Sequence, residues 1–453
     1  LGFGMHAYYS GGMLDNPREY DVFEDLLPIA DEEGIEIVPV VPGLAFYDDF
    51  PEWNEPESCF QLDIDGQSVR RFFGRVPDPL RPQVQAKLLA FLTEFLDRCG
   101  GHSCVPAVAF KVNGKIGTCY VGTSENDPPE EAGYAEWDIE QFEEATGIEV
   151  GGTAGDAGSR YRWLREHAWE EWINWRCDGT GDLWLKARDL ARSRGKELVV
   201  KTILPCNHPG RFKRWWDRGQ SPFDILRGHG YDWRMYENER GLIIQQCMLV
   251  GSDRYFGQWQ NKAYAYDPRL IPGYRTAEGT STELYFVYWE LPDHPKAFRV
   301  GPGAPPGRAF FEPITYAIRT TNTYSVTLYN WYRATMFHEQ DLREFCRAFR
   351  ALPAVAPRDF EGDVQPADDP RLWVKWFGDR LCILNDSSAP QRVKLTWPRR
   401  LRRGEAVFDV GRGIVLARAT KATGPRLSVA LELDAWDLRT LELRDAKARD
   451  GAR

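Results

Sequence analysis

Acidic residues beside aromatic runs are the side chains in this sequence best suited to chemistry. Glu290 follows the strand-like run Glu283–Trp289 and has Tyr288 and Trp289 immediately before it. A carboxylate at the end of a buried strand is costly to hide without a partner or a purpose. Two such carboxyl groups, placed across a glycosidic bond, can cleave it. We therefore expect Glu290 to be catalytic, and the alternative is a surface glutamate that caps the Leu291-Pro292 turn.

The second carboxyl group has several candidates. Glu237 is the first choice, because Tyr236 and the nearby Trp233 would raise the pKa of its carboxyl by excluding water. Glu125 is the second choice. We expect the Glu237 carboxyl within about 10 Å of that of Glu290, the upper end of paired-carboxylate spacing. Each candidate could instead form a structural ion pair or cap. Three further carboxylates stay open: Asp127, Glu239 and Asp253.

Aromatic residues are abundant, at 17 Trp, 19 Tyr and 24 Phe, and this excess makes sugar binding a plausible function. Flat apolar rings match the C–H faces of sugar rings, and aromatic side chains commonly line ligand sites. For any one tryptophan, a place in the core is the alternative. The expected substrate-binding residues are Asn113, Lys115, His208, Tyr236, Asp253, Trp259, Tyr288, Trp289 and Trp331.

Sequence motifs for other chemistries are missing. The seven histidines form neither HxH nor HExxH, the nine cysteines form no CxxC pair, and no GxSxG elbow occurs. Most cysteines lie in apolar runs and are expected to be small core residues. Asp63-Ile64-Asp65-Gly66 lacks the further acidic ligands of a calcium loop, so it predicts a turn. We expect no metal and no cofactor.

The charge balance limits the partners. The chain has 57 basic and 67 acidic residues, a net charge of −10, which argues against a nucleic-acid binder. No apolar run approaches the roughly 18 residues of a membrane span. The expected partner is an oligosaccharide or polysaccharide, with no nucleic acid and no membrane. A homo-oligomer, and a cytoplasmic or periplasmic location, are left open.

The elements that must position these residues alternate between strands and helices over the first 350 residues, which predicts a parallel sheet. Continuous apolar runs indicate strands buried on both faces. A closed barrel needs eight strands, so strand 1 is expected upstream of this sequence or in an irregular form. The seven candidates are Gly2–Tyr9, Ile35–Val41, Ala107–Asn113, Glu197–Ile203, Leu242–Val250, Glu283–Trp289 and Tyr324–Trp331.

Two helical segments carry helix-breaking residues. Asn16-Pro17 predicts a helix start and Gly34 its end, with Pro28 kinking or shortening the helix between them. Residues 160–194 predict one long helix or two, with a break near Gly179-Thr180-Gly181. Long segments follow the strands, and in barrels such segments build the active site.

The pattern changes after residue 353. A segment rich in Pro and Asp, 354–370, predicts a linker, and short alternating strands over 371–445 predict an antiparallel β-sandwich. The expected architecture is α/β: a (β/α)8 TIM-type barrel over 1–353 as the catalytic domain, followed by the linker and the C-terminal sandwich.

Four stretches resemble clan A glycoside hydrolases, in the style of family 42 β-galactosidases. Val108–Val112 resembles their fourth barrel strand, and Arg162-Trp163-Leu164 the helical excursion after it. Tyr324–Pro353 resembles the closing strand and helix, and Leu372–Leu443 the terminal β-domain. The resemblance implies catalytic glutamates at the ends of strands 4 and 7, with Glu290 as the nucleophile.

Strand 4 departs from the family pattern of Asn-Glu, because Asn113 is followed by Gly114 and Lys115. Neither residue can protonate a leaving group as a carboxylic acid does. The main hypothesis is therefore a retaining glycosidase whose acid lies elsewhere. One alternative is a catalytically inactive carbohydrate-binding pseudoenzyme. Another is a hydrolase of anionic polysaccharide, whose carboxylate or sulfate groups would bind Lys115, Arg70, Arg71 and Arg254.

Overall fold

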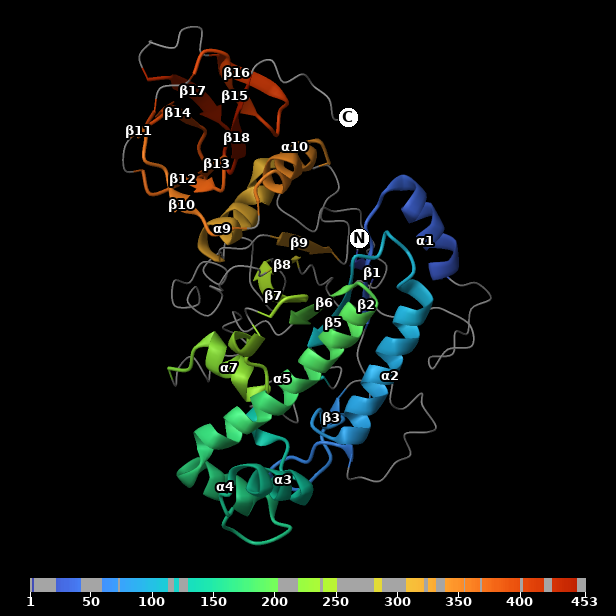
Figure 1. Cartoon of the computed structure of the whole chain (residues 1–453). Coiled ribbons are helices and arrows are strands. Elements are labelled where there is room, and N and C mark those ends of the chain that lie inside the picture. The colour runs from blue at the N-terminus through green and yellow to red at the C-terminus, as the bar shows by residue number, and fades with distance from the viewer. Residues whose placement is uncertain are drawn as a thin grey trace, which may run out of the picture. The chain divides into compact units, whose positions relative to one another are not determined.

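The computed structural model divides the chain into two compact units, Leu1–Cys247 and Met248–Arg453 (Figure 1). Among the residues it describes, no helix combines the length and apolar character needed to cross a membrane. The described residues are 2–3, 22–41, 59–71, 74–112, 118–121, 129–202, 219–236, 239–250, 281–286, 307–321, 325–330, 339–353, 355–366, 369–399, 402–418 and 426–445.

Parallel strands follow one another in chain order, as the βα alternation predicts. In the second unit, β8 (Ser281–Phe286) and β9 (Ser325–Asn330) form a parallel pair. The parallel sheet is therefore confirmed, and its closure into a barrel stays a prediction. The earlier strands are β1 (Gly2–Phe3), β2 (Val38–Val41), β5 (Ala107–Val112), β6 (Glu197–Thr202) and β7 (Leu242–Val250), all paired in parallel.

Two strand boundaries differ from prediction. The strand expected from Glu283 begins at Ser281, and residues 287–289 of the expected range lie outside the described residues. The strand expected from Ile35 begins at Val38, because Gly34 has a φ of 64° and the Ile35 N–H still donates to the Ala30 carbonyl. The chain is therefore still leaving the preceding helix at Ile35, and only Val38–Val41 joins the sheet.

Helices cover one face of these strands, and α2 and α5 run side by side (Figure 1). Each buries an apolar face, as helical spacing of apolar residues predicts. The helices of this unit are α1 (Val22–Glu33), α2 (Pro82–Cys99), α3 (Glu136–Thr146), α4 (Ala157–His167), α5 (Trp169–Ser193) and α7 (Pro222–Gly228), with short 3-10 turns η4 (Pro129–Glu131) and η5 (Trp233–Tyr236).

Two predictions of helix breaks differ in outcome. α1 continues past Pro28, with Phe23, Leu27 and Ala30 buried in the core, so Pro28 does not end the helix, and a kink there stays a prediction. The long segment breaks at Ala168 rather than at the glycines of α5. A Cβ at Gly179 would lie 2.5 Å from Leu80 Cδ2, so the absence of a side chain there is what lets Leu80 pack against the helix.

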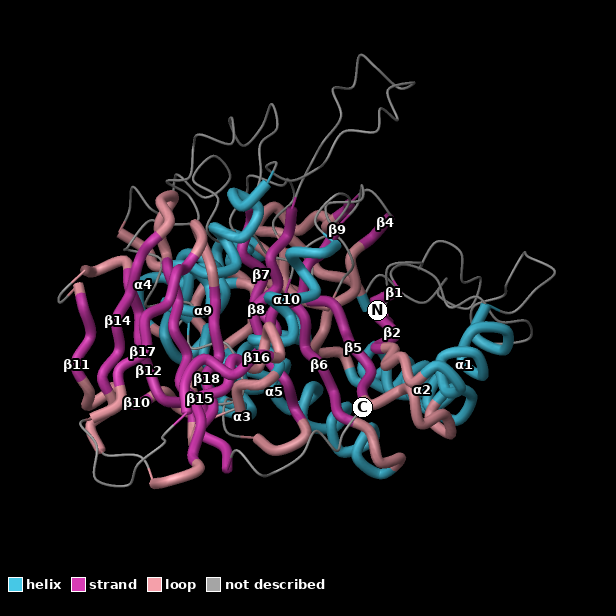
Figure 2. Tube along the Cα trace, turned by 90° about the horizontal axis from the view of Figure 1, so that it is seen from above, coloured by secondary structure: helices cyan, strands magenta, loops and turns pink. Residues whose placement is uncertain are grey.

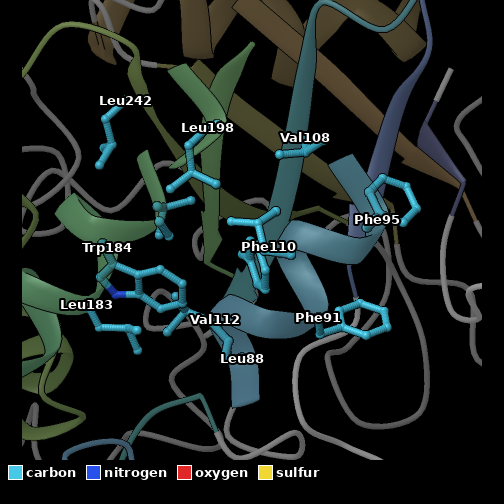
Figure 3. Packing of buried hydrophobic residues seen from close by; sticks show 14 of the residues in the cluster. Leu88, Phe91, Phe95, Val108, Phe110, Val112, Leu183, Trp184, Leu198 and Leu242 are labelled. Atoms are coloured by element: carbon cyan, nitrogen blue, oxygen red, sulfur yellow. The ribbon is translucent and has the colours of Figure 1, made fainter. Parts of the chain in front are cut away.

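The core of the first unit forms where β5 meets the helices (Figure 3). Val108, Phe110 and Val112 point to the helical side, where the Phe110 ring lies 6.0 Å from that of Trp184. Ala107 and Ala109 pack with Val199 and other small residues on the opposite face. Strands buried on both faces, expected from the continuous apolar runs, are therefore confirmed for β5.

Two antiparallel sheets in the second unit share one apolar cluster, which includes Leu381, Trp397 and Leu431. Figure 2 shows β11, β14 and β17 side by side in the smaller sheet. That sheet consists of β11 (Asp363–Gln365), β14 (Gln391–Thr396) and β17 (Ser428–Leu433). The larger one has the order β10 (Arg358–Asp359), β12 (Leu372–Phe377), β13 (Arg380–Asn385), β18 (Leu438–Asp445), β15 (Glu405–Asp409) and β16 (Ile414–Arg418).

Helices precede these sheets in the second unit: η7 (Gly307–Phe311), α9 (Glu312–Thr321) and α10 (Glu339–Arg350). α10 packs on β18, where the Thr440 hydroxyl donates to the Ala348 carbonyl at 2.6 Å. The strands β10 and β11 lie inside the segment 354–370, so that part of the chain pairs with both sheets.

Two smaller predictions are confirmed. Asp63 forms a turn in which its Oδ1 accepts from the backbone N–H groups of Asp65 and Gln67, and Gly66 has a φ of 73°. Most described cysteines are buried thiols, whereas Cys346 is exposed.

Candidate functional site

Within each unit, the last described residues of neighbouring parallel strands are in register. In the first unit, Val112 at the end of β5 is in register with Thr202 at the end of β6. In the second, Phe286 at the end of β8 is in register with Asn330 at the end of β9. Parallel strands place their carboxyl ends at one edge of a sheet, and barrel enzymes build their sites there. We therefore expect the site residues in the segments that follow these strands in the sequence.

The predicted site residues belong to those following segments and lie outside the described residues. Of Tyr236, the structure describes the backbone, which ends η5. The described residues therefore give no distance between the predicted catalytic carboxylates. Outside the description lie the catalytic candidates Glu125, Glu237 and Glu290, the alternatives Asp127 and Asp253, the binding candidates Asn113, Lys115, His208, Trp259, Tyr288, Trp289 and Trp331, and Arg254.

One alternative acid is described, and it has a structural role. The carboxylate of Glu239 forms an ion pair with the guanidinium of Arg188 on α5. Arg188 also pairs with Asp189. The hypothesis of a structural ion pair therefore fits Glu239 better than that of an acid catalyst. Arg70 lies with Arg71 in the short strand β3 (Arg70–Arg71), which pairs with β4 (Gly74–Arg75), and its side chain is exposed.

Sequence reasoning missed a buried lysine one residue before the end of β6. Lys201 is 4% exposed, and its register partners are Lys111 on β5 and Gln245 on β7. Val199 precedes it by two residues and belongs to the cluster on the face opposite the helices, so Lys201 lies on that face too. A buried ammonium requires a partner. A lysine inside an otherwise apolar strand was the signal in the sequence.

Tyr120 organises the segment that follows β5. Its ring is fully buried, with the Arg176 guanidinium 3.5 Å from the ring centroid. Gly133 has a φ of 90°, and a Cβ there would lie 2.4 Å from Tyr120 Cε1. The amide of Gln61 donates to the carbonyls of Pro77 and Cys119. These contacts hold residues 118–121 in place, between the stretches that contain the predicted Lys115 and Glu125.

Two carboxyl groups meet beneath this segment. Asp78 and Asp138 are both fully buried, and the Tyr120 hydroxyl donates to Asp78 Oδ1 at 3.2 Å. Burial, and then the charge of Asp78, raise the pKa of Asp138 well above its usual range. A side-chain hydrogen bond to Asp78 raises the pKa further, so Asp138 keeps its proton and is the donor of that bond. Because neither carboxyl reaches solvent, we interpret the pair as structural.

Among the described residues, Asp31, His102 and Cys104 form a group whose potential ligand atoms lie within 4.8 Å of one another. The Asp31 carboxylate lies 2.7 Å from His102 Nδ1, and it accepts from the Ser103 hydroxyl at 2.7 Å and from the Cys104 backbone N–H at 2.6 Å. These hydrogen bonds hold the pKa of Asp31 well below its usual range. The geometry is that of a hydrogen-bonded link between α1 and the turn before β5.

No model of a known protein family matches the sequence, and no curated protein matches it. Similar solved structures include a noncanonic maltogenic α-amylase from Thermotoga neapolitana, with 11% identity, a TM-score of 0.37, and coverage of 93% of this chain and 81% of that one. A β-galactosidase from the psychrophilic Marinomonas ef1 has 12% identity and a TM-score of 0.40, over 73% of this chain and 49% of that one.

A family 30 subfamily 8 xylanase from Clostridium acetobutylicum has 10% identity and a TM-score of 0.34, over 92% of this chain and 91% of that one. All three proteins are named as glycoside hydrolases or by a carbohydrate substrate. TM-scores below 0.5 are too low to assign this chain to any of their families, so the expected resemblance to family 42 stays a prediction.

Proposed function

We propose that this chain is a glycoside hydrolase in which Glu290 is the nucleophile of a retaining mechanism. The observation that supports this proposal is the parallel register of β8 and β9 in the second unit, which aligns their last described residues, Phe286 and Asn330. Glu290 is four residues past the end of β8, so its Cα lies within about 14 Å of the Phe286 Cα. Trp331 is the first residue after β9. Catalytic residues of barrel enzymes come from such strand ends.

The proposed mechanism has two steps. The Glu290 carboxylate attacks the anomeric carbon while an acid protonates the leaving oxygen, which gives a covalent glycosyl-enzyme. A water, deprotonated by the same acid residue, then releases the sugar. Glu237 is the proposed acid and Glu125 the second choice, since Gly114 and Lys115 follow Asn113 where the family has its glutamate. Tyr288, Trp289 and Trp331 would supply the aromatic walls of the site.

We propose further that residues 1–353 form a closed (β/α)8 barrel, joined by residues 354–370 to a β-sandwich over 371–445. Support for the barrel comes from parallel strands that pair in chain order, as barrel strands do. Support for the sandwich comes from two antiparallel sheets with a shared apolar cluster. The linker would then add one short strand to each sheet.

The test is the Glu290→Gln variant, which keeps the size of the side chain and removes its negative charge. We expect hydrolysis of nitrophenyl glycosides and oligosaccharides to fall at least about 10³-fold, as when a covalent nucleophile is removed. Glu283→Gln, on the same strand β8, is the matched control. Azide should restore turnover to Glu290→Ala with inversion at the anomeric carbon. Wild-type turnover by Glu290→Gln would remove this residue from the mechanism.

The acid is tested in the same assay by a second matched pair. Glu237→Gln should lower the rate for substrates with poor leaving groups more than for nitrophenyl substrates. Glu239→Gln, two residues away, is the control because Glu239 is engaged by Arg188. Equal effects of the two substitutions would transfer the role to Glu125.

A second candidate function is hydrolysis of an anionic polysaccharide, whose carboxylate or sulfate groups would bind basic side chains such as that of the exposed Arg70 on β3. Arg70→Met would then raise KM for uronic acid oligomers and leave neutral substrates unaffected. Gly114-Lys115 in place of the family acid favours the third candidate, a carbohydrate-binding pseudoenzyme. Binding of oligosaccharides without any turnover by the wild-type chain would establish it.

A further inference from the structure

A groove of about 440 Å³ lies in the first unit between the start of α2, the length of α3 and the middle of α5. Its volume falls within the roughly 300–1,000 Å³ of small-molecule sites. All of its lining residues are described, and none belongs to the predicted catalytic set. The groove therefore needs an explanation of its own.

Two tryptophans provide the apolar surface of the groove, Trp137 on α3 and Trp175 on α5, and both are partly buried. The guanidinium of Arg81 lies 4.1 Å from the Trp137 ring centroid. The Trp175 ring stacks on Trp172, with centroids 5.0 Å apart. Both indoles are thus held by other side chains, so little side-chain entropy would be lost when a ligand packs on them.

Hydrogen-bonding groups of both kinds surround these rings. Glu144 and Asp182 supply exposed carboxylate acceptors, and Lys186 supplies an ammonium donor. The Gln141 amide donates to the Glu144 carboxylate at 3.3 Å, and the Gln85 amide donates to the Pro79 carbonyl at 3.0 Å. A ligand that fits must both donate and accept, as hydroxyl groups do.

The charges of the groove exclude other ligand classes. Two carboxylates against one ammonium disfavour a phosphate, sulfate or carboxylate ligand. An organic cation could pack on the two tryptophans beside the carboxylates, but it would leave the Lys186 ammonium without an acceptor. A neutral ligand with flat apolar faces and many hydroxyl groups satisfies all of these groups together.

Gly179 keeps the groove open. It lies on α5 in the groove wall, and a Cβ there would lie 2.5 Å from Leu80 Cδ2 and 3.4 Å from Cδ1. An added methyl group would therefore force the Leu80 side chain, which also lines the groove, out of its present position. Glycine in the interior of a helix is less favourable than alanine by about 1 kcal/mol. Gly179 shapes this wall of the groove in spite of that cost.

We propose that this groove binds a neutral oligosaccharide, at a binding site whose lining includes none of the predicted catalytic residues. The sugar rings pack on Trp137 and Trp175, and their hydroxyl groups bond to the carboxylates, the amides and Lys186. Binding here does not depend on hydrolysis, so this inference goes beyond the proposed function and can be tested without it.

The experiment is calorimetric titration of the full chain carrying Glu290→Gln with maltohexaose, cellohexaose and xylohexaose, and with hexagalacturonate and choline as charged probes. At least one neutral hexasaccharide should bind. Trp137→Ala and Gly179→Ala should each weaken that binding at least tenfold, and exposed Glu144→Ala should weaken it severalfold. Trp163→Ala is the matched control, since that ring stacks on His167 of α4 and does not line the groove.

Three results would overturn the inference. The first is that no neutral hexasaccharide binds the chain at millimolar concentration. The second is that the Trp137→Ala and Glu144→Ala variants bind the hexasaccharide as tightly as the Trp163→Ala variant does. The third is that a charged probe binds more tightly than every neutral hexasaccharide. Thermal unfolding of each variant shows whether it is folded. If Trp137→Ala fails to fold, Glu144→Ala, on the exposed side of α3, still tests whether the groove binds the oligosaccharide. Turnover by the unmodified chain is measured separately, so failure of hydrolysis and failure of groove binding are told apart.

Discussion

At the scale of single residues, the proton shared by Asp78 and Asp138 makes stability depend on pH. Burial and the charge of Asp78 raise the pKa of Asp138, so the folded chain holds a proton that the unfolded chain releases above about pH 4. The free energy of unfolding should therefore fall as pH rises from about 4, by up to about 1.4 kcal/mol per pH unit, until the folded pKa is passed.

Asp138→Asn should remove this slope, because an amide keeps a donor toward Asp78 and cannot titrate. Urea unfolding of the variant and the wild type between pH 4.5 and 8 measures the difference. Glu140→Gln, on the exposed side of the same helix, should keep the wild-type slope. Parallel curves for Asp138→Asn and the wild type would mean that the two carboxyl groups do not share a proton.

Two glycines allow the cost of backbone strain to be measured apart from the cost of steric crowding. Gly133 and Gly66 both have positive φ, but a Cβ at Gly133 would meet the Tyr120 ring, whereas one at Gly66 has no heavy atom within 4 Å. Gly66→Ala should lower the free energy of unfolding by about 1–2 kcal/mol, the cost of a left-handed alanine. Gly133→Ala should lower it by a further 1–3 kcal/mol or so through overpacking. Equal losses in chemical denaturation would contradict this account of Tyr120.

Residue-level prediction from the sequence worked where the signal is local. The turn at Asp63 follows from neighbouring residue types, and so do the buried cysteines. The groove could not be predicted from the sequence, because Trp137 and Trp175 lie on different helices and only packing brings them together in its lining. Lys201 stands out in the sequence as a lone lysine within an apolar strand, but the sequence does not show which face of the sheet its side chain occupies.

At the scale of elements, the packing of α10 against β18 and the turn between β15 and β16 leaves no room for a larger side chain at Ala348. Ala348 is 1% exposed, and a Cβ added at Gly411 would lie 2.9 Å from the Cβ of Ala348. Ala348→Leu should therefore push the helix from the sheet and lower the free energy of unfolding by about 1–3 kcal/mol. The exposed neighbour Arg347→Leu should change it by no more than about 0.5 kcal/mol. Similar losses for both variants in urea would argue against close packing here.

Elements could be predicted from the sequence when they carry their own apolar pattern. The strand β7, for example, begins at Leu242 as expected. The two-residue strand β10 and the three-residue strand β11 were missed, because their extended form is set by the partners β12 and β14 rather than by local preference. The break in residues 160–194 was misplaced, since the need for Leu80 to pack at Gly179 outweighed the low helix propensity of glycine.

At the scale of the whole molecule, the change from apolar runs joined by helices to short alternating strands predicted a parallel sheet followed by antiparallel ones. The register of the parallel strands then predicts where the site residues begin. The pairing of catalytic carboxylates could not be obtained in this way. It depends on the course of long segments after the strands, which periodicity does not determine, and Gly114-Lys115 removes the family position that would have fixed one partner.

The strand order of the larger antiparallel sheet has a consequence for biosynthesis. β18 comes after every other strand of that sheet in the sequence, yet it pairs with β13 on one side and β15 on the other. On the ribosome, both of those strands emerge before the one that joins them, and each presents a row of unpaired backbone groups meanwhile. Translation must pass residue 445 before these edges close, so the nascent chain is open to chaperone capture and to misassociation throughout that interval.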